Sequence, residues 1–184
     1  MSDKRQRLLD AALRLAHESG LSRTTLARIA EESKVPLGNI YYYFRTKEAL
    51  WRAVIEVRRG QVEQVLARAA TAPDPKAQLL ALTEYFLEAG DEISRFGCPF
   101  GGLCHDLSQE EGVDPELRAA PLATLLDWAD ERFQTLGQPK KEARRLAGHL
   151  VAGIQGGALL AHAMADPKLL RREIRFLQRW IETV

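Results

Sequence analysis

Residues 24–50 read TTLARIAEESKVPLGNIYYYFRTKEAL, and this stretch decides the fold. It contains two short segments with helical spacing of apolar residues, separated by residues 33–35. A helix-turn-helix holds two helices nearly at right angles across such a short turn, and therefore needs a small residue where the helices touch. Ala30 is that small residue, and the apolar positions that lock the second helix against the first are Ile29, Val35 and Ile40. We therefore expect a helix-turn-helix here.

The outward side of the second helix of this pair carries few charges but many hydrogen-bonding groups and flat rings. Its residues are Leu37, Gly38, Asn39, Tyr41, Tyr42 and Tyr43. Short polar side chains near a helix N-terminus reach base edges in the major groove, and tyrosine hydroxyls and backbone amides hold phosphates. The alternative is a packing surface, but neighbours on a helix point about 100 degrees apart, so three consecutive tyrosines cannot all face one core. We favour a surface that contacts DNA.

Positive charge surrounds this surface. Residues 1–59 contain 12 Lys and Arg against 7 Asp and Glu, whereas the remaining residues carry a net charge of −4. The flanking cations are Arg23, Arg28, Lys34, Arg45 and Lys47. Lys47 lies in the first turn of the next expected helix, where the helix dipole disfavours a cation, and a bound phosphate accounts for its presence there. This asymmetry favours a polyanion, such as double-stranded DNA, as the partner of the N-terminal end.

The segments 24–30, 35–44 and 46–50 resemble the DNA-binding domain of the TetR/AcrR family of repressors. The core of the resemblance is the pattern Gly-x-x-Tyr-x-x-Phe-x-x-Lys, here Gly38, Tyr41, Phe44 and Lys47, and it covers about residues 4–55. The resemblance implies phosphate contacts from Thr24, Thr25 and Lys47, base contacts from Leu37, Gly38 and Asn39, base or phosphate contacts from Tyr41 and Tyr42, and a DNA-backbone contact from Tyr43. Phe44 is expected in the core.

Two positions depart from the family pattern. Lys34 stands where the turn often has glycine, so either the turn is distorted or Lys34 tolerates the conformation and offers its charge to DNA. Pro36 and Leu37 replace a polar pair that is common there, which leaves Asn39 and the tyrosines as the main hydrogen-bonding readers.

Helical periodicity continues to the end of the chain, so the expected fold class is all-α. We expect a helix-turn-helix head over residues 1–50 and a body for effector binding and dimerisation over 51–184, with a long connecting helix from about 46 to 70. The other expected helices lie near residues 4–19, 76–96, 115–136, 139–165 and 167–184. Residues 146–165 lack a formal charge over a length that can span a bilayer, but a helix buried by protein explains them as well. No membrane partner is expected.

The penultimate expected helix carries a stripe of small residues at four-residue steps. The stripe includes Gly153, Gly157 and Ala161, and the last helix supplies complementary bulk at Leu170, Ile174, Leu177 and Ile181. The family resemblance implies that the last two helices pair with those of a second copy as a four-helix bundle. A homodimer of this kind places two recognition helices about 34–36 Å apart or somewhat more and predicts a palindromic operator. The alternative is a stripe that packs within the monomer.

An apolar cavity with a few polar groups is what an effector pocket requires. The candidate lining residues are Tyr85, Phe86, Cys98, Phe100, Leu103, Trp128, Phe133, His149 and Gln155, each of which has ordinary packing as its alternative. If Pro99 opens a short helix, Cys98 caps it and its thiolate is favoured, which makes oxidation or electrophile modification of Cys98 an alternative release signal. The competing interpretation is that Cys98 and Cys104 are structural thiols.

These observations together predict a ligand-responsive regulator, a repressor by the family resemblance, with a small-molecule effector of unknown identity. The competing classes are an enzyme and a scaffold whose head no longer contacts DNA. The four histidines show no nucleophile or metal-ligand spacing, and no phosphate-binding glycine loop is present, so we expect no catalytic residue, cofactor or metal. Two cysteines and no visible signal peptide predict a cytoplasmic location.

Overall fold

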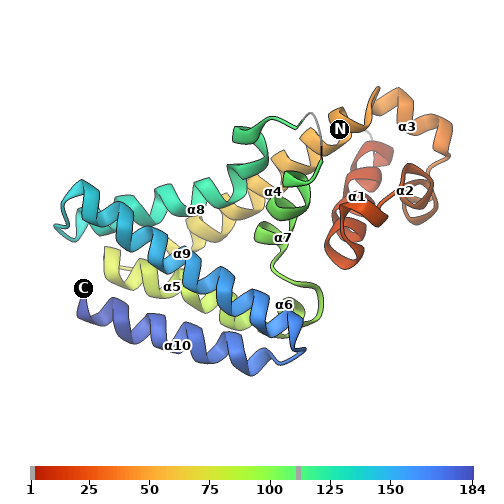
Figure 1. Cartoon of the computed structure of the whole chain (residues 1–184). Coiled ribbons are helices and arrows are strands. Elements are labelled where there is room, and N and C mark those ends of the chain that lie inside the picture. The colour runs from red at the N-terminus through yellow and green to blue at the C-terminus, as the bar shows by residue number, and fades with distance from the viewer. Residues whose placement is uncertain (1–2, 111–112) are drawn as a thin grey trace. The chain divides into compact units, whose positions relative to one another are not determined.

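The structure is a computed structural model that describes residues 3–110 and 113–184, and every regular element in those ranges is helical (Figure 1). The elements in chain order are α1 (Asp3–Ser19), the 3-10 helix η1 (Leu21–Arg23), α2 (Leu26–Ser33), α3 (Leu37–Tyr43), α4 (Lys47–Ala69), α5 (Pro75–Glu88), α6 (Gly90–Phe96), α7 (Pro99–Ser108), α8 (Pro115–Thr135), α9 (Lys140–Ala163) and α10 (Pro167–Thr183). The all-α prediction is confirmed.

The described residues form two compact units. The head unit comprises residues 1–59 and 102–121, and the body unit comprises residues 60–101 and 122–184. This division differs from the expected one, because the long helix α4 passes from the head unit to the body unit and residues 102–121 return to the head unit. The physical reason is that the last two turns of α7 carry buried leucines of the head core.

The core of the head unit is built from helices that lie far apart in the sequence. Leu8 and Leu9 of α1, Leu50 of α4, and Leu103 and Leu107 of α7 are all buried in one apolar cluster. Helices α2 and α3 are only eight and seven residues long, well short of the length at which isolated helices are stable in water. Packing on this cluster therefore maintains them.

The junction between α1 and α2 depends on one glycine and one carboxylate. Gly20 adopts a φ of 78°, which glycine tolerates without steric penalty. The amide of Leu21 then donates a 2.8 Å hydrogen bond to Oδ2 of Asp106 in α7. A Cβ atom at Gly20 would lie 3.3 Å from the same carboxylate oxygen, so a larger residue would disturb both features.

In the body unit, α9 packs closely on α10. A Cβ atom at Gly153 would lie 3.0 Å from Cδ2 of Leu177, and one at Gly157 would lie 3.0 Å from Cβ of Glu173. Ala161 on the same stripe is fully buried, and so are the expected partners Leu170, Ile174, Leu177 and Ile181. Within the chain, the small side chains of the stripe therefore admit α10, and the expectation that these residues form a dimer interface stays a prediction.

Two further expectations concern single helices. The helix expected over 76–96 is interrupted at Ala89, where φ is −81° and ψ is 1°, so that α5 ends and α6 begins at Gly90. Helix α9 contains the uncharged segment 146–165 up to Ala163. None of the described helices, α9 included, combines the length and the apolar character that crossing a membrane requires.

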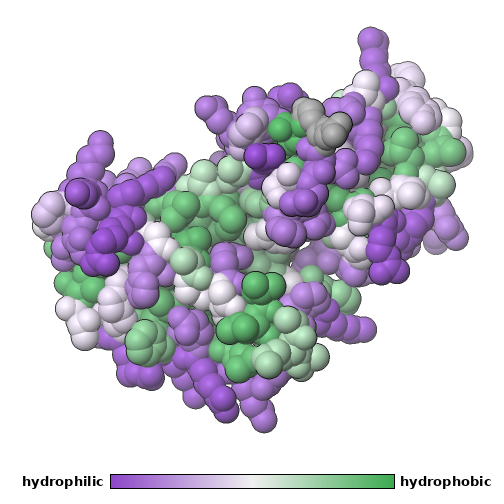
Figure 2. All heavy atoms as spheres, viewed as in Figure 1, coloured by the Kyte–Doolittle hydropathy of each residue, from purple (hydrophilic) through white to green (hydrophobic). Residues whose placement is uncertain are grey.

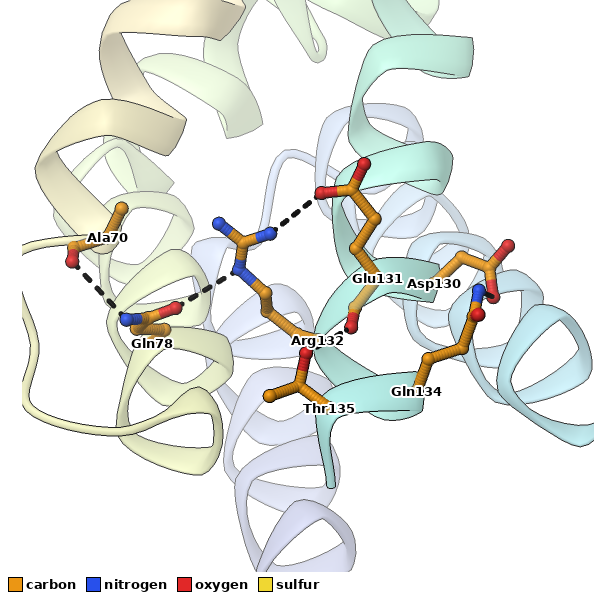
Figure 3. A network of polar contacts seen from close by, with 7 residues as sticks. All are labelled: Ala70, Gln78, Asp130, Glu131, Arg132, Gln134 and Thr135. Carbon is orange, nitrogen blue, oxygen red and sulfur yellow. Dashed lines mark hydrogen bonds and ion pairs between the residues drawn. The ribbon is translucent and has the colours of Figure 1, made fainter. Parts of the chain in front are cut away.

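A polar network stabilises the turn that follows α4 (Figure 3). Gln78 of α5 donates from Nε2 to the carbonyl oxygens of Ala70 and Ala72, at 3.3 and 3.1 Å. Its Oε1 accepts a 3.0 Å hydrogen bond from Nε of Arg132 in α8, and the Arg132 guanidinium lies 4.5 Å from the ring centroid of Trp128. One side chain therefore joins the end of α4, the start of α5 and the C-terminal part of α8.

We expect Gln78→Ala to lower the free energy of unfolding by about 1–3 kcal/mol, because it leaves partly buried carbonyl and guanidinium groups without their partner. Urea unfolding followed by circular dichroism at fixed protein concentration measures this. The matched control is Gln134→Ala, which removes only an exposed hydrogen bond to Asp130 and should change stability by less than about 0.5 kcal/mol. Equal effects of the two variants would show that the network contributes nothing specific.

Candidate nucleic-acid interface

Helix α3 packs against the head core with one side and exposes the other side to solvent. Ile40 is buried together with Val35 and Ile29, as the helix-turn-helix pattern predicts. Pro36 precedes the helix and its carbonyl accepts a 2.8 Å hydrogen bond from the amide of Asn39. Because the helix is anchored through Ile40, the residues on its opposite side face away from the head core.

The outward side of α3 is the surface that the sequence predicts to contact DNA, and we call the residues of 37–43 other than the buried Ile40 the reading ridge. Leu37, Gly38, Tyr41 and Tyr42 are exposed, and Asn39 and Tyr43 are half-buried. Tyr42 is 82% exposed and its ring lies edge-on to that of Tyr43, with centroids 5.0 Å apart. Large exposed rings beside one another are typical of an interaction surface rather than of a monomer's solvated face.

Gly38 has no packing role within the head unit. An added Cβ atom would meet no side chain or remote backbone atom of the described residues within 4 Å. A glycine inside a helix costs about 1 kcal/mol relative to alanine. Packing within the head unit therefore does not explain a glycine at this position, and the backbone of α3 is open to solvent there.

The turn before α3 contains Lys34, which stands where the family pattern often has glycine. Lys34 has φ 55° and ψ 34°, the left-handed conformation, and its amide and that of Val35 donate back to carbonyls of the last turn of α2. Lys34 therefore tolerates the conformation, and the turn is not distorted. Its side chain is exposed, as are the flanking cations Arg23, Arg28, Arg45 and Lys47.

The two threonines at the start of α2 have different environments. Thr24 is 3% exposed and its hydroxyl donates a 2.8 Å hydrogen bond to the carbonyl of Gly20, so the structure assigns it to the α1–α2 junction. The phosphate contact expected of Thr24 stays a prediction that this burial does not support. Thr25 is exposed, and as the N-cap of α2 its hydroxyl accepts from the amide of Arg28 at 3.2 Å. Only Thr25 has side-chain surface available for a phosphate.

The start of α4 lies in the head unit and carries Lys47. The hydroxyl of Thr46 caps this helix by accepting from the amide of Ala49 at 3.1 Å. The pKa of Glu48 is lowered, first by a hydrogen bond from its own backbone amide and then by one from Thr46. The ammonium of Lys47 lies 3.1 Å from Oε2 of Glu110 and 5.9 Å from the ring centroid of Trp51.

Sequence reasoning missed the two acidic residues that contact this region. Asp106 accepts from the amide of Leu21, and Glu110 pairs with Lys47. Both lie more than 60 positions from their partners, so no local pattern could connect them. The only available signal was the apolar spacing of Leu103 and Leu107, which predicts a buried helical face without saying against what it packs.

The residues predicted to bind an effector fall into separate groups. Tyr85 stacks on Phe100 at 6.1 Å and lies edge-on to the buried Phe86 at 5.1 Å. Gln155 lies against Gly101, where an added Cβ atom would meet its Oε1 at 2.1 Å, and its buried Nε2 has no hydrogen-bond partner among the described residues. These four residues beside Gly101 are the first group, and all belong to the body unit.

The remaining members of that set lie elsewhere. Phe133 and His149 both contact Trp180, with ring centroids 5.9 and 4.6 Å apart, and Trp128 lies under Arg132. Leu103 belongs to the buried core of the head unit, which corrects its expected place in a body pocket. The reason is that α7 has passed into the head unit by residue 102. Pro99 opens α7 as expected, and Cys98 before it is only 6% exposed.

Within the ranges 3–110 and 113–184, no group of three or more His, Cys, Asp or Glu side chains is arranged to hold a metal ion. The geometry of the head unit instead combines a short exposed helix, a tight turn and surrounding cations. This is the arrangement of a helix-turn-helix DNA-binding protein.

The comparisons with known proteins agree with that class. Residues 8–54 match the family model described as "Bacterial regulatory proteins, tetR family". The chain is 35% identical to the HTH-type transcriptional regulator BetI of Burkholderia mallei over 185 residues, which cover 97% of this chain and 92% of the relative. It is 30% identical to the HTH-type transcriptional regulator LmrA of Bacillus subtilis over 165 residues, or 86% of each chain. The protein belongs to the TetR family of transcriptional regulators.

Solved structures support the fold along nearly the whole chain. A TetR transcriptional regulator from Legionella pneumophila superposes with a TM-score of 0.86 at 20% identity, with 97% of each chain covered. A regulatory protein TetR from Rhodobacter sphaeroides gives a TM-score of 0.84 at 24% identity, covering 97% of this chain and 98% of that one. The predicted family, the helix-turn-helix head on a helical body and the role as a regulator rather than an enzyme are therefore confirmed.

The left-handed conformation of Lys34 is tested by comparing two substitutions at this position, glycine and alanine. Lys34→Gly and Lys34→Ala remove the same charge, so both should weaken DNA binding equally and reduce its salt dependence. Only glycine adopts the left-handed conformation freely, so Lys34→Gly should be more stable to unfolding than Lys34→Ala by about 1 kcal/mol. Thermal unfolding and gel shifts on the same two proteins measure both quantities. Equal stabilities would contradict the assigned turn geometry.

Proposed function

We propose that the protein is a ligand-responsive repressor that binds a palindromic operator as a homodimer and leaves it when a small-molecule effector binds. The observation that carries this proposal is the exposed ridge 37–43 on a helix anchored by Ile40. The DNA partner is a bacterial operator, so we place the protein in the cytoplasm.

In the proposed complex, α3 lies in the major groove. Leu37, Gly38 and Asn39 at its N-terminal end face base edges, as recognition helices do. Tyr41 and Tyr42 contact bases or phosphate. Thr25, Lys34, Tyr43 and Lys47 are proposed to contact the DNA backbone, which sets the position of α3 in the groove.

The proposed dimer face is the exposed side of α9 and α10. Four large apolar side chains are between 53% and 67% exposed: Leu159 and Leu160 of α9, Met164 directly after α9, and Phe176 of α10. Hydrophilic side chains cover most of the face shown in Figure 2, and a hydrophobic patch lies over the C-terminal part of α9. Large apolar side chains gathered in this way favour a protein partner, and a symmetric second copy would bury them.

The effector site is proposed to lie in the body unit beside Tyr85, Phe100 and Gln155. The unpaired Nε2 of Gln155 supports this, because a buried amide without a partner costs free energy that a ligand acceptor would recover. An effector that prefers a body conformation with wrongly spaced heads would release DNA by shifting the population, through helices such as α4 that belong to both units. Cys98 is buried, so modification of its thiol is the less supported signal.

Operator binding is tested by gel shifts and fluorescence anisotropy on the DNA that flanks the coding region, repeated across salt concentrations. We expect one palindrome to bind tightly with a steep salt slope. Tyr42→Ala should weaken binding at least about tenfold, which is about 1.4 kcal/mol, with no loss of thermal stability because Tyr42 is exposed. Lys47→Ala should weaken binding and make the salt slope shallower.

The matched control for Lys47 is Lys140→Ala, since each lysine is exposed and is the first residue of its helix. Lys140→Ala should leave operator affinity unchanged. Normal affinity in both Tyr42→Ala and Lys47→Ala would contradict the placement of α3, and uniform weak binding to all sequences would contradict an operator-binding function.

The dimer face has its own test. Leu160→Glu buries a charge in the proposed interface and should convert the dimer to monomer in sedimentation velocity, with a corresponding loss of operator affinity. The control Lys141→Glu places the same charge on an exposed position of the same helix and should leave the dimer intact. A dimer that survives glutamate both at Leu160 and at Met164 would place the interface elsewhere.

A further inference from the structure

One cation of the proposed DNA-binding surface is already paired with an anion of its own chain. Oε2 of Glu110 lies 3.1 Å from Nζ of Lys47, although the two residues are 63 positions apart. Both side chains remain partly exposed, 45% for Lys47 and 28% for Glu110, so a third group can reach the pair.

The turn that follows α7 and the buried residues at the end of that helix fix the position of Glu110. The chain continues to turn after α7 ends, because the amides of Gln109 and Glu110 donate to the carbonyls of Asp106 and Leu107 at 3.0 and 3.3 Å. Leu107 is fully buried in the head core, and Asp106 is fixed by its hydrogen bond from the amide of Leu21. The carboxylate of Glu110 therefore stands beside Lys47 as part of the folded head unit.

We propose that Glu110 is an intramolecular competitor of the DNA phosphate for Lys47 and so limits the affinity of the head for its operator. The inference rests on the proposed contact between Lys47 and DNA. When a duplex binds, the ammonium of Lys47 either leaves the carboxylate of Glu110 for a phosphate or contacts both groups at once. In either case the carboxylate remains close to the phosphate and repels it.

Glu110 lies in a segment of the head unit that contacts residues on both sides of the reading ridge in the sequence. Asp106 contacts Leu21, before the ridge, and Glu110 contacts Lys47, after it. Any change that moves the end of α7 therefore alters the charge presented to DNA without altering α3 itself.

Glu110→Gln tests the proposal, since it keeps the shape of the side chain and removes only its charge. An exposed ion pair of this kind is worth up to about 1 kcal/mol, so operator affinity should rise about two- to fivefold per head, or about 4- to 25-fold for two heads. The salt slope should steepen, by up to about 0.9 per head, because Lys47 is then free to neutralise a phosphate.

The control for net charge is Glu116→Gln, which removes an exposed carboxylate from the same unit, six residues further along the chain. It should raise affinity much less than Glu110→Gln does. A double-mutant cycle isolates the pair: in a Lys47→Gln background, Glu110→Gln should lose most of its effect, because there is no ammonium left to release.

Three results would overturn the proposal: no gain in affinity for Glu110→Gln, an equal gain for Glu116→Gln, or a gain that persists undiminished in the Lys47→Gln background. The last two would show that Glu110 acts only through overall charge. Failure of the proposed function looks different, since the wild-type protein would then bind no palindrome tightly. A specific, salt-dependent complex that is indifferent to Glu110→Gln rejects this inference alone.

Discussion

The burial of Ile40 is the interaction on which the DNA-binding surface depends. Helix α3 has seven residues and would not persist alone in water, so its orientation comes from the side chain that it inserts into the head core beside Val35 and Ile29. Because Ile40 is anchored in the core, the residues on the opposite side of α3 face away from it. Rings and backbone that the core does not need, such as Tyr42 and Gly38, are presented outward in a fixed direction. A surface that is fixed in this way is able to recognise DNA with little loss of conformational entropy.

Sequence reasoning predicted the parts of the molecule whose signals are local. The helix-turn-helix pattern, the capped start of α4 and the outward tyrosines follow from spacing within about 25 residues, and the structure agrees with them. The different environments of the adjacent Thr24 and Thr25 were not predictable, because only the backbone conformation decides that Thr24 is buried against Gly20 and that Thr25 caps α2. Gly153 and Gly157 pointed to close helix packing, and close packing is what occurs. The pattern could not tell whether the second helix came from the same chain.

Helix α7 is the feature that the sequence concealed most completely. Its first turn carries Phe100, which is buried in the body core, and its later turns carry Leu103 and Leu107, which are buried in the head core. The apolar spacing of such a helix predicts that it is buried but does not show which of the two cores each residue joins. Asp106 in this helix holds the α1–α2 junction, and Glu110, two residues after the helix ends, pairs with Lys47. Residues 102–110 are in this way a structural part of the head unit.

A crystal structure of the protein on its operator would show whether the reading ridge enters a duplex groove. We expect α3 to lie in the major groove, with Asn39 and Tyr42 within hydrogen-bonding distance of base edges or phosphates. We also expect two symmetry-related ridges to meet successive major-groove faces of one duplex. A complex in which another surface contacts the DNA while the α3 tyrosines remain in solvent would show that the ridge is not the DNA-binding surface.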